Sequence, residues 1–309
     1  MIELEHVTKR YHATAAVVDD VSMAVAKDEF FVIIGSSGAG KSTVLKMINQ
    51  LVLPSAGTIR IDGRDVRDAR IEQLRRRIGY VIQSIGLFPH WTVARNIATV
   101  PELLGWPAVR SRERAAALLG QLKLPPEVYL DKYPHQLSIG QQQRVGIARA
   151  LAADQDILLM DEPFGALDPI TREALQGEIA EIQRASRKTV VFVTHDMDEA
   201  LRLGSRIAVM DGGRLIQVGT PVELLTAPAS DFVRELIGRD DLGIKLLGLA
   251  TVESRLRAGD GAPGAPIAAA ASLRQALSRM VAEGRDRLAV ADGEGRTLGA
   301  IHLVDLLRR

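Results

Sequence analysis

The feature that most constrains this fold is a glycine-rich loop between a buried strand and a helix. Residues 30–34 (FFVII) are a short aromatic and β-branched run, which is typical of a buried strand. Residues 35–42 (GSSGAGKS) follow at once and fit G-x-x-x-x-G-K-[ST]. Residues 41–51 then place apolar side chains at helical spacing. A chance match in a chain of this length has odds on the order of one in a hundred, and the pattern requires this strand–loop–helix context.

The loop predicts a phosphate-binding site. Glycines let backbone N–H groups converge on phosphate oxygens without Cβ clashes, and the helix N-terminus adds partial positive charge. Lys41 is expected to reach the β- and γ-phosphates of a nucleotide, and the Ser42 hydroxyl to bind Mg²⁺. The alternative is an ordinary glycine-rich turn. The residues predicted to bind nucleotide here are Gly35, Ser36, Ser37, Gly38, Ala39, Gly40, Lys41, Ser42 and Thr43.

An acidic pair follows a second buried strand. Asp161 and Glu162 come directly after the apolar run 157–160. The carboxyl ends of parallel strands form the edge of a sheet where ligands bind. Asp161 is therefore expected to hold Mg²⁺, directly or through water, and Glu162 to orient or deprotonate an attacking water. The alternative is a solvated acidic pair at a strand end, which the phosphate loop makes the weaker interpretation.

The rest of the first 240 residues indicates an α/β fold. Residues 57–63 predict a strand ending in an Asp-Gly turn, and residues 189–194 a third buried strand. Strands alternating with helices imply a largely parallel sheet covered on both faces. The 47% apolar and 25% charged residues fit a globular protein, and no apolar run reaches the ~18 residues that span a bilayer. The absence of cysteine rules out disulfides and thiolate metal sites.

Charge gives no reason to expect a nucleic-acid partner. The formal net charge is +1. A local cluster of arginines at 70 and 75–77 has no interleaved aromatic residues. It is therefore interpreted as a solvated face near a helix end.

The C-terminal residues predict a separate, small α+β unit. Residues 258–271 are rich in Gly, Pro and Ala and are interpreted as a linker or surface loop. Residues 272–284 predict a helix. Residues 287–291 and 298–301, joined through Asp292-Gly293, predict a hairpin, and residues 304–307 a short closing helix.

Residues 1 to about 240 resemble the ATP-binding cassette (ABC) ATPases, a P-loop NTPase family with a RecA-like core and a helical subdomain. The resemblance implies ATP and Mg²⁺ as cofactors. In it, Gln83 is the Q-loop glutamine that senses Mg²⁺ and the γ-phosphate, and His195 is the switch histidine that contacts the γ-phosphate. Tyr11 stacks on adenine. The remaining family positions are the signature Ser138, Gly140 and Gln141, the Walker B pair Asp161 and Glu162, and the D-loop residue Asp168.

One departure from the family pattern concerns the signature. The family usually has Leu-Ser-Gly-Gly-Gln, whereas Ile139 replaces the first glycine here. In the family, two cassettes pair head to tail, so that Ser138 and Gly140 of one copy would face the γ-phosphate held by the other. If the backbone at Ile139 needed a positive φ, strain of about 1–3 kcal/mol would slow turnover, and Ile139→Gly would raise it.

A narrower resemblance concerns residues 83–90 (QSIGLFPH) and 47–51 (MINQL), which are similar to the ATPases of quaternary-amine osmoprotectant importers. These move glycine betaine, choline, carnitine or proline betaine. The resemblance implies a peripheral protein on the cytoplasmic face of the bacterial plasma membrane. A second copy of the chain would be one partner. A permease would dock on the helical subdomain at about 84–135, where Leu87, Phe88 and Trp91 could line the groove, and an extracytoplasmic binding protein would act indirectly.

The expected organisation is an ATP-binding domain at 1–238, a linker at 239–264 and a unit at 265–309 that resembles a single CBS motif. That unit could sense ionic strength or a nucleotide, or only stabilise a dimer. Two other functions stay open: an importer ATPase for another small polar substrate, and a soluble ABC ATPase outside transport. The second class tends to carry two cassettes or a long coiled-coil insert, and residues 43–137 are too few for that insert.

Overall fold

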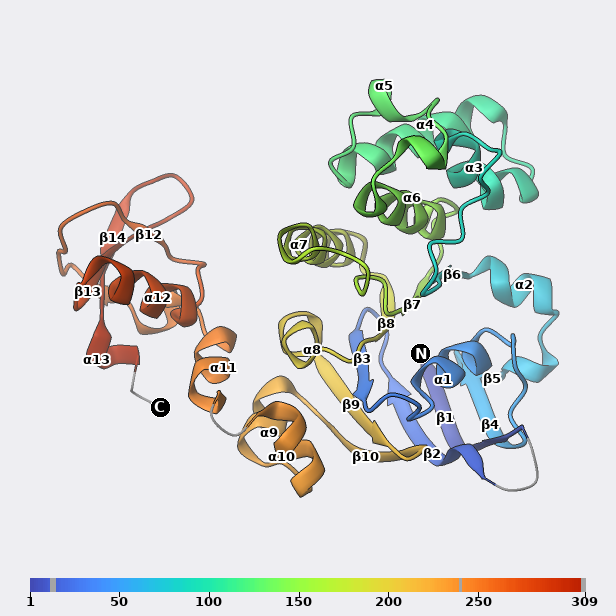
Figure 1. Cartoon of the computed structure of the whole chain (residues 1–309), viewed down its shortest axis with the longest axis horizontal. Helices are drawn as coiled ribbons and strands as arrows, with labels where there is room; N and C mark the ends of the chain where they lie inside the picture. Colours follow the sequence, from blue (N-terminus) through green and yellow to red (C-terminus); the bar gives the residue numbers. More distant parts are fainter. Residues whose placement is uncertain (12–14, 239–240, 307–309) are drawn as a thin grey trace. The chain divides into compact units, whose positions relative to one another are not determined.

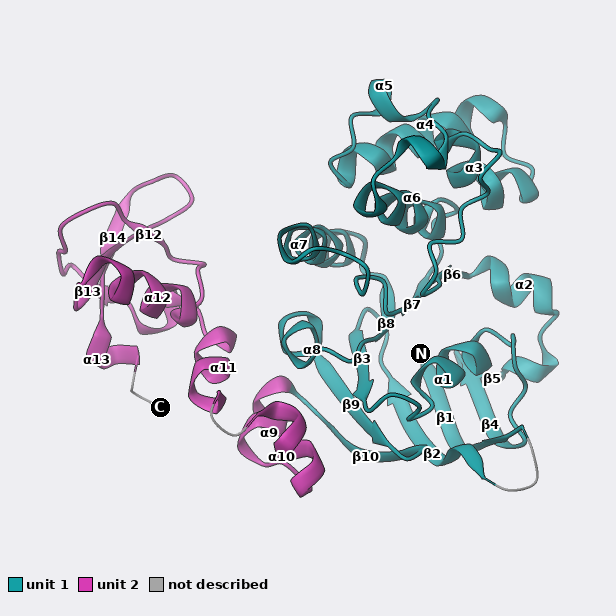
Figure 2. Cartoon of the chain, in the orientation of Figure 1, with its two compact units in different colours: residues 1–220 teal, residues 221–309 magenta. Residues whose placement is uncertain are grey.

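The computed structural model describes residues 1–11, 15–238 and 241–306. The chain divides into two compact units, residues 1–220 and residues 221–309 (Figure 2). The sequence analysis set its first boundary after residue 238, so helices α9 (Pro221–Thr226) and α10 (Asp231–Ile237) fall in the second unit rather than the first. Two residues of the expected linker, 239 and 240, lie outside the described part.

The centre of the first unit is a six-stranded sheet in the order β10-β9-β3-β8-β7-β6 (Figure 1). Strands β9, β3, β8, β7 and β6 run parallel, and β10 is antiparallel to β9. Strands β3, β7 and β8 are buried throughout, as expected of parallel strands covered on both faces. The bounds are β3 (Phe30–Gly35), β6 (Ile78–Val81), β7 (Ile157–Asp161), β8 (Thr189–Val193), β9 (Arg206–Asp211) and β10 (Arg214–Gly219).

An antiparallel sheet in the order β2-β1-β4-β5 completes the strand framework of this unit. Its strands are β1 (Ile2–Arg10), β2 (Ala16–Val25), β4 (Ala56–Ile61) and β5 (Arg64–Asp65). Asp62 and Gly63 both have positive φ between β4 and β5, which confirms the Asp-Gly turn. One core joins this sheet to the inner face of β3, β7 and β8, and helix α1 (Lys41–Ile48) lies in it with four fully buried apolar side chains: Val44, Leu45, Met47 and Ile48.

A helical group gathers apart from the central sheet, at the top of Figure 1. It contains α3 (Val93–Leu103), α4 (Ala108–Gln121), α5 (Pro126–Tyr129) and the turn η2 (Pro134–Gln136). Helix α6 (Ile139–Leu151) packs against α3 and α4, so the group extends beyond the range 84–135 expected from the sequence. The other helical elements are η1 (Val66–Asp68), α2 (Ile71–Arg76), α7 (Pro169–Ser186) and α8 (Met197–Leu203).

The second unit contains a mixed sheet in the order β11-β14-β13-β12. Strands β13 (Arg287–Ala291) and β14 (Thr297–His302) form the expected antiparallel hairpin, and α12 (Leu273–Glu283) has Ser272 as its N-cap and Gly284 as its C-cap. Their core includes the fully buried Leu273, Leu288 and Ile301. The remaining elements are α11 (Leu242–Leu249), η3 (Val252–Arg255), β11 (Arg257–Ala258), β12 (Ile267–Ala268) and α13 (Leu303–Leu306).

The segment at 239–264, which was expected to be a linker, has regular secondary structure in its described residues. It contains α11, η3 and β11, and Val252 is fully buried in the core of the second unit. Glycine-rich residues 259–264 do form a loop. Among the described residues, no helix combines the length and apolar character needed to cross a membrane.

Candidate active site

The glycine-rich loop joins the end of β3 to the start of α1, as the sequence predicts. Gly35 has φ +155°, and a Cβ there would stand 1.8 Å from the Met210 carbonyl oxygen of β9. Gly40 has φ +89° and is the N-cap of α1. A Cβ on Gly40 would stand 2.4 Å from the Val17 carbonyl oxygen. These glycines let the neighbouring strands approach the loop closely.

Lys41 is almost fully buried, with 5% of its surface exposed. Its Nζ donates to the carbonyl oxygens of Gly35 and Ser36, both at 2.8 Å. Burial lowers the pKa of Lys41, and the nearby Glu162 and Asp161 carboxylates partly counter this. The ammonium thus sits beside both acidic groups while bonded only to neutral carbonyls of its own loop.

Ser42 and Asp161 are brought together from positions 119 residues apart. The Ser42 hydroxyl donates to Asp161 Oδ1 at 2.7 Å. Asp161 is 3% exposed, and burial raises its pKa although the Ser42 hydrogen bond lowers it. Mg²⁺ prefers such oxygen ligands, and a cation would relieve the cost of this buried carboxylate. No cluster of three or more His, Cys, Asp or Glu suited to a metal occurs in the described ranges, so a cation here would need phosphate or water oxygens as well.

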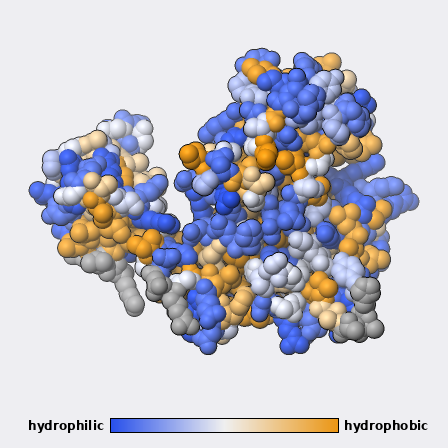
Figure 3. Space-filling model, viewed as in Figure 1, coloured by the Kyte–Doolittle hydropathy of each residue, from blue (hydrophilic) through white to orange (hydrophobic). Residues whose placement is uncertain are grey.

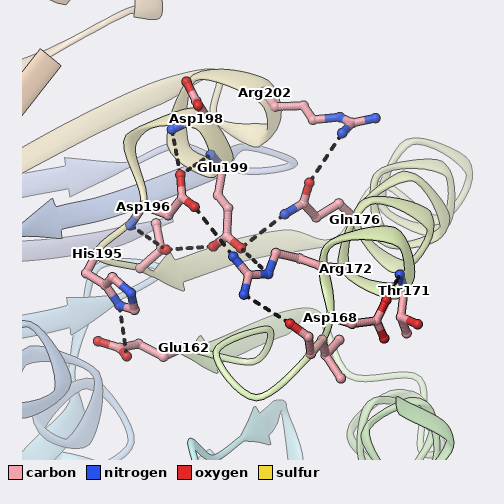
Figure 4. Close-up of polar contacts among 12 residues, drawn as sticks. Glu162, Asp168, Thr171, Arg172, Gln176, His195, Asp196, Asp198, Glu199 and Arg202 are labelled. Carbon is pink, nitrogen blue, oxygen red and sulfur yellow. Dashed lines mark hydrogen bonds and ion pairs between the residues drawn. The ribbon is translucent and has the colours of Figure 1, made fainter. Parts of the chain in front are cut away.

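Glu162 meets two predicted site residues at one oxygen, and Figure 4 shows one of these contacts, that with His195. Its Oε2 lies 3.1 Å from His195 Nδ1 and 3.4 Å from Gln83 Nε2. The Glu162 side chain is 20% exposed and the His195 side chain 63% exposed. Glu162 also has φ 44°, a left-handed conformation that is uncommon outside glycine, while its N–H donates to the Val193 carbonyl at 3.0 Å. Such a backbone is held by its surroundings and turns the carboxylate toward the histidine.

The signature residues form the first turn of α6. The Ser138 hydroxyl accepts from the Gln141 N–H at 3.3 Å, and Gln141 Oε1 accepts from the Ser138 N–H at 3.0 Å, which is a capping box. Gln141 Nε2 also donates to the Tyr129 hydroxyl at 3.0 Å. Their contacts are thus local to α6 and its neighbours. A Cβ on Gly140 would meet the Thr171 methyl of α7 at 2.8 Å.

The strain considered for Ile139 is absent from this structure. Ile139 is the first residue of α6, is not among the positive-φ residues, and is 53% exposed. A β-branched residue adopts this helical conformation without strain. The expectation that Ile139 slows turnover through a forced positive φ therefore loses its basis.

The last two predicted site residues are Asp168 and Tyr11. Their contacts within one chain do not by themselves indicate a role in the site. Asp168 is the N-cap of α7 and accepts from the Thr171 N–H at 3.0 Å. Hydrogen bonds from the Thr171 side chain and then from its N–H lower the pKa of Asp168. Tyr11 is 51% exposed, and Lys9 Nζ lies 5.0 Å from its ring centroid. Its ring is accessible, and the next residues, 12–14, lie outside the described part.

Some residues that support the site lie outside the sequence motifs and were not predicted. Asp211, at the end of β9, accepts from the Ser36 hydroxyl at 2.6 Å. Arg149 of α6 donates to the Gly86 carbonyl at 2.7 Å and the Ile85 carbonyl at 3.3 Å, close behind Gln83 in the chain. The Asp211-Gly212-Gly213 turn was readable in the sequence, but its approach to the loop was not.

Comparisons with known proteins agree with this geometry. The ABC transporter family matches residues 18–165. The chain is 51% identical over 307 residues to the glycine betaine uptake system ATP-binding protein YehX of Escherichia coli (strain K12), covering 99% of both chains. It is 54% identical over 242 residues to the glycine betaine/carnitine/choline transport ATP-binding protein OpuCA of Bacillus subtilis (strain 168), covering 78% of this chain and 63% of that relative.

A solved structure, the dimeric post-hydrolysis state of the ATP-binding cassette MJ0796 bound to ADP and Pi, is also similar. The TM-score is 0.65 at 34% identity, with 72% of this chain and 99% of that chain covered. The family match, the nearly full-length relative and the similar cassette structure all indicate the same family. This chain belongs to the ATP-binding subunits of ABC transporters and is closely related to those of glycine betaine, choline and carnitine uptake.

Proposed function

We propose that this chain is the ATPase of an importer for an osmoprotectant such as glycine betaine, choline, carnitine or proline betaine. The nearly full-length relative from Escherichia coli is a glycine betaine uptake protein, and a Bacillus subtilis relative serves glycine betaine, carnitine and choline. Selectivity among these would belong to the subunits that contact the osmolyte.

The observation that best supports the proposal of ATP hydrolysis is the position of the Glu162 carboxylate. Its Oε2 is shared by His195 and Gln83, and its neighbour Asp161 bonds to Ser42 at the start of α1. This arrangement would place a water-activating carboxylate beside the phosphates cradled by the loop. Ser42 and Asp161, with Gln83, are the residues that would hold Mg²⁺, and the cation would supply positive charge that stabilises the phosphate oxygens.

The proposal includes a second copy of this chain. The similar cassette structure is a dimer, and the relative is an ATP-binding protein of an uptake system. Ser138 and Gly140 head α6, and their contacts are local rather than to the loop of the same chain. In a head-to-tail pair they would complete the γ-phosphate site of the other copy, with Asp168 beside them, while Tyr11 would stack on adenine.

The permease would dock on the helical group. Phe88 is 38% exposed, and its ring lies 4.3 Å from that of Trp91. Leu103 and Val109 of the same group are 75% and 70% exposed, and Figure 3 shows apolar residues among hydrophilic ones on this part of the surface. Such docking would hold the chain on the cytoplasmic face of the bacterial plasma membrane, with an extracytoplasmic binding protein acting through the permease.

The C-terminal unit is proposed to regulate transport in response to ionic strength or a nucleotide. Its buried core runs from Val252 to Leu306. Deleting residues 258–309 would leave Val252 without that core, whereas a stop after Gly238 removes the whole of it and keeps α9 and α10 of the second unit. Full ATPase activity with an altered salt dependence of uptake would support regulation. Identical salt curves would favour a purely structural appendage.

Glu162→Gln tests the hydrolytic assignment. The amide keeps the shape but removes the base, so we expect the ATPase rate to fall about 10²–10⁴-fold while ATP still binds and a dimer accumulates. The measurements are phosphate release and light scattering with ATP. Glu181→Gln, an exposed isosteric change on α7, is the matched control. Full-rate hydrolysis by Glu162→Gln would refute the role of Glu162. Uptake of labelled betaine and choline in cells lacking this chain would test the substrate class.

A further inference from the structure

A polar chain of side chains connects the two segments that flank the Glu162 carboxylate. One segment runs from Glu162 to Asp168, and the other is 194–196, which contains His195. We call the connecting residues the Arg172 bridge; its members, drawn in Figure 4, are Arg172, Gln176, Thr194, Asp196 and Glu199.

Glu199 is the buried centre of the bridge. It lies in the first turn of α8 and is 7% exposed. Its Oε2 accepts from the Thr194 hydroxyl at 2.6 Å, and its Oε1 accepts from Gln176 Nε2 at 3.0 Å. Burial raises the pKa of Glu199, while the bond from Thr194 and the facing Arg172 lower it. Such a buried carboxylate is tolerated only with hydrogen-bonded partners.

Thr194 links the Glu199 carboxylate to the backbone on both sides of His195. Its hydroxyl donates to Glu199 and accepts from the Asp196 N–H at 3.0 Å. Its own N–H donates to the Ile33 carbonyl of β3 at 3.2 Å. The backbone on both sides of His195 is therefore fixed, whereas the imidazole is largely exposed. Because surrounding side chains do not cage the imidazole, its direction toward Glu162 depends mainly on this backbone.

Arg172 connects the bridge to the other segment. Its Nη2 donates to the Leu167 carbonyl at 3.1 Å, next to Asp168. Its Nη1 lies 3.7 Å from Asp196 Oδ2, and its Nε lies 3.9 Å from Glu199 Oε1. That Nε is a buried donor without a hydrogen bond in the described structure. An approach of about one ångström would complete the bond to Glu199.

The contacts close into a ring. Leu167 N–H donates to the Phe164 carbonyl, and Phe164 is 1% exposed, so the segment after Glu162 is rigid. From Leu167 the ring continues through Arg172, Glu199 and Thr194 to His195, which returns to Glu162 Oε2. An ordinary surface ion pair would need neither the buried carboxylate nor the bond to a loop carbonyl.

We infer that Arg172 is a positioning residue for ATP hydrolysis: it fixes the segment ending at Asp168 relative to His195, through Glu199 and Thr194, and so sets the Glu162–His195 geometry. The inference rests on the proposed ATPase function and adds a residue to that same site. Among its described contacts, Arg172 touches neither the nucleotide-binding loop nor Glu162, so it acts through other residues.

The test compares Arg172→Ala and Arg172→Lys in the full chain with Arg184→Ala. Arg184 is on the same helix and bonds only within it, to the Ala180 carbonyl, among its described contacts. A misplacement of about an ångström near the chemistry costs up to about a hundredfold. We therefore expect Arg172→Ala to lower kcat about 10- to 100-fold. KM for ATP and Kd for ADP should change less than about threefold, because the loop is untouched. Arg172→Lys should regain part of the rate.

The double variant Arg172→Ala/Glu199→Gln separates positioning from stability. Glu199→Gln removes the carboxylate that Arg172→Ala leaves unpaired, so Tm should recover relative to Arg172→Ala while kcat stays low. Recovery of kcat together with Tm would overturn the inference, as would a wild-type kcat in Arg172→Ala or an equal loss of ADP binding. A wild-type chain that hydrolyses no ATP would instead overturn the proposed function itself.

Discussion

Gly35→Ala is the sharpest test of the loop geometry, because the structure predicts steric rather than catalytic damage. The new Cβ would stand 1.8 Å from the Met210 carbonyl oxygen, whereas real Cβ contacts are essentially never under 3.0 Å. The obstacle is backbone of the adjacent strand β9, which cannot rotate aside. Gly35 and Met210 must separate by more than an ångström, although both are buried where β3 and β9 pair.

The size of the effect follows from this overlap. Overpacking of a buried site costs about 1–3 kcal/mol and occasionally more, and here backbone must move, so we expect about 3 kcal/mol or more. For a unit of 220 residues this lowers Tm by roughly 6–12 °C. Gly38→Ala is the matched control: its φ is +80°, but a Cβ there meets nothing within 4 Å. It should cost only the conformational strain, about 1–2 kcal/mol.

The assay is thermal and urea unfolding of both variants without nucleotide, followed by ADP titration. Gly35→Ala should unfold well below Gly38→Ala and bind ADP weakly even where it is folded. Equal losses of stability in the two variants would refute the steric argument. They would show that the loop relaxes away from β9, and that the glycine at position 35 is required only for backbone conformation.

Two other variants follow from the site. Burial raises the pKa of Asp161, so the folded state holds its proton more tightly than the unfolded state, and stability falls as pH rises from the ordinary carboxyl range through the folded pKa. Asp161→Asn should therefore raise Tm of the nucleotide-free protein near neutral pH, converge with wild type at low pH, and lose any Mg²⁺-dependent rise; a variant less stable than wild type at neutral pH would contradict this. Ile139→Gly relieves no strain and costs about 0.5 kcal/mol of helix propensity, so phosphate release should not speed up; a several-fold faster rate would restore the strain argument.

The parts of the site that could be predicted from sequence are those encoded within one short segment. The loop, its lysine and the acidic pair each follow a strand directly, and strand order then brings β3 and β7 to the same edge on either side of β8. The bond from Ser42 to Asp161 is a consequence of that order. The local caps at Ser138 and Ser272 were likewise readable, because an N-cap depends on residues three positions apart.

The parts that could not be predicted depend on long-range contact or on backbone conformation. Glu162 has a left-handed φ, which its residue type does not predict. This conformation accompanies the hydrogen bond from its N–H to the Val193 carbonyl. Arg172 and Glu199 occupy ordinary helical positions, and only the packing of α7 beside α8 makes them partners. Helix α11 was missed because its glycines lowered its apparent helical propensity.

The predicted phosphate-binding groups share a property that bears on nucleotide affinity. Lys41 is bonded to two neutral carbonyls, Ser42 to Asp161, and Ser138 to a backbone N–H. A phosphate would therefore exchange existing hydrogen bonds at Lys41 and Ser42, whereas the Ser138 hydroxyl acts as an acceptor in its bond and could still donate. The gain from a neutral to a charged acceptor applies to Lys41, whose burial already disfavours its charged form. Lys41 should consequently contribute most of the free energy of phosphate binding, while Ser42 and Ser138 mainly position the phosphates.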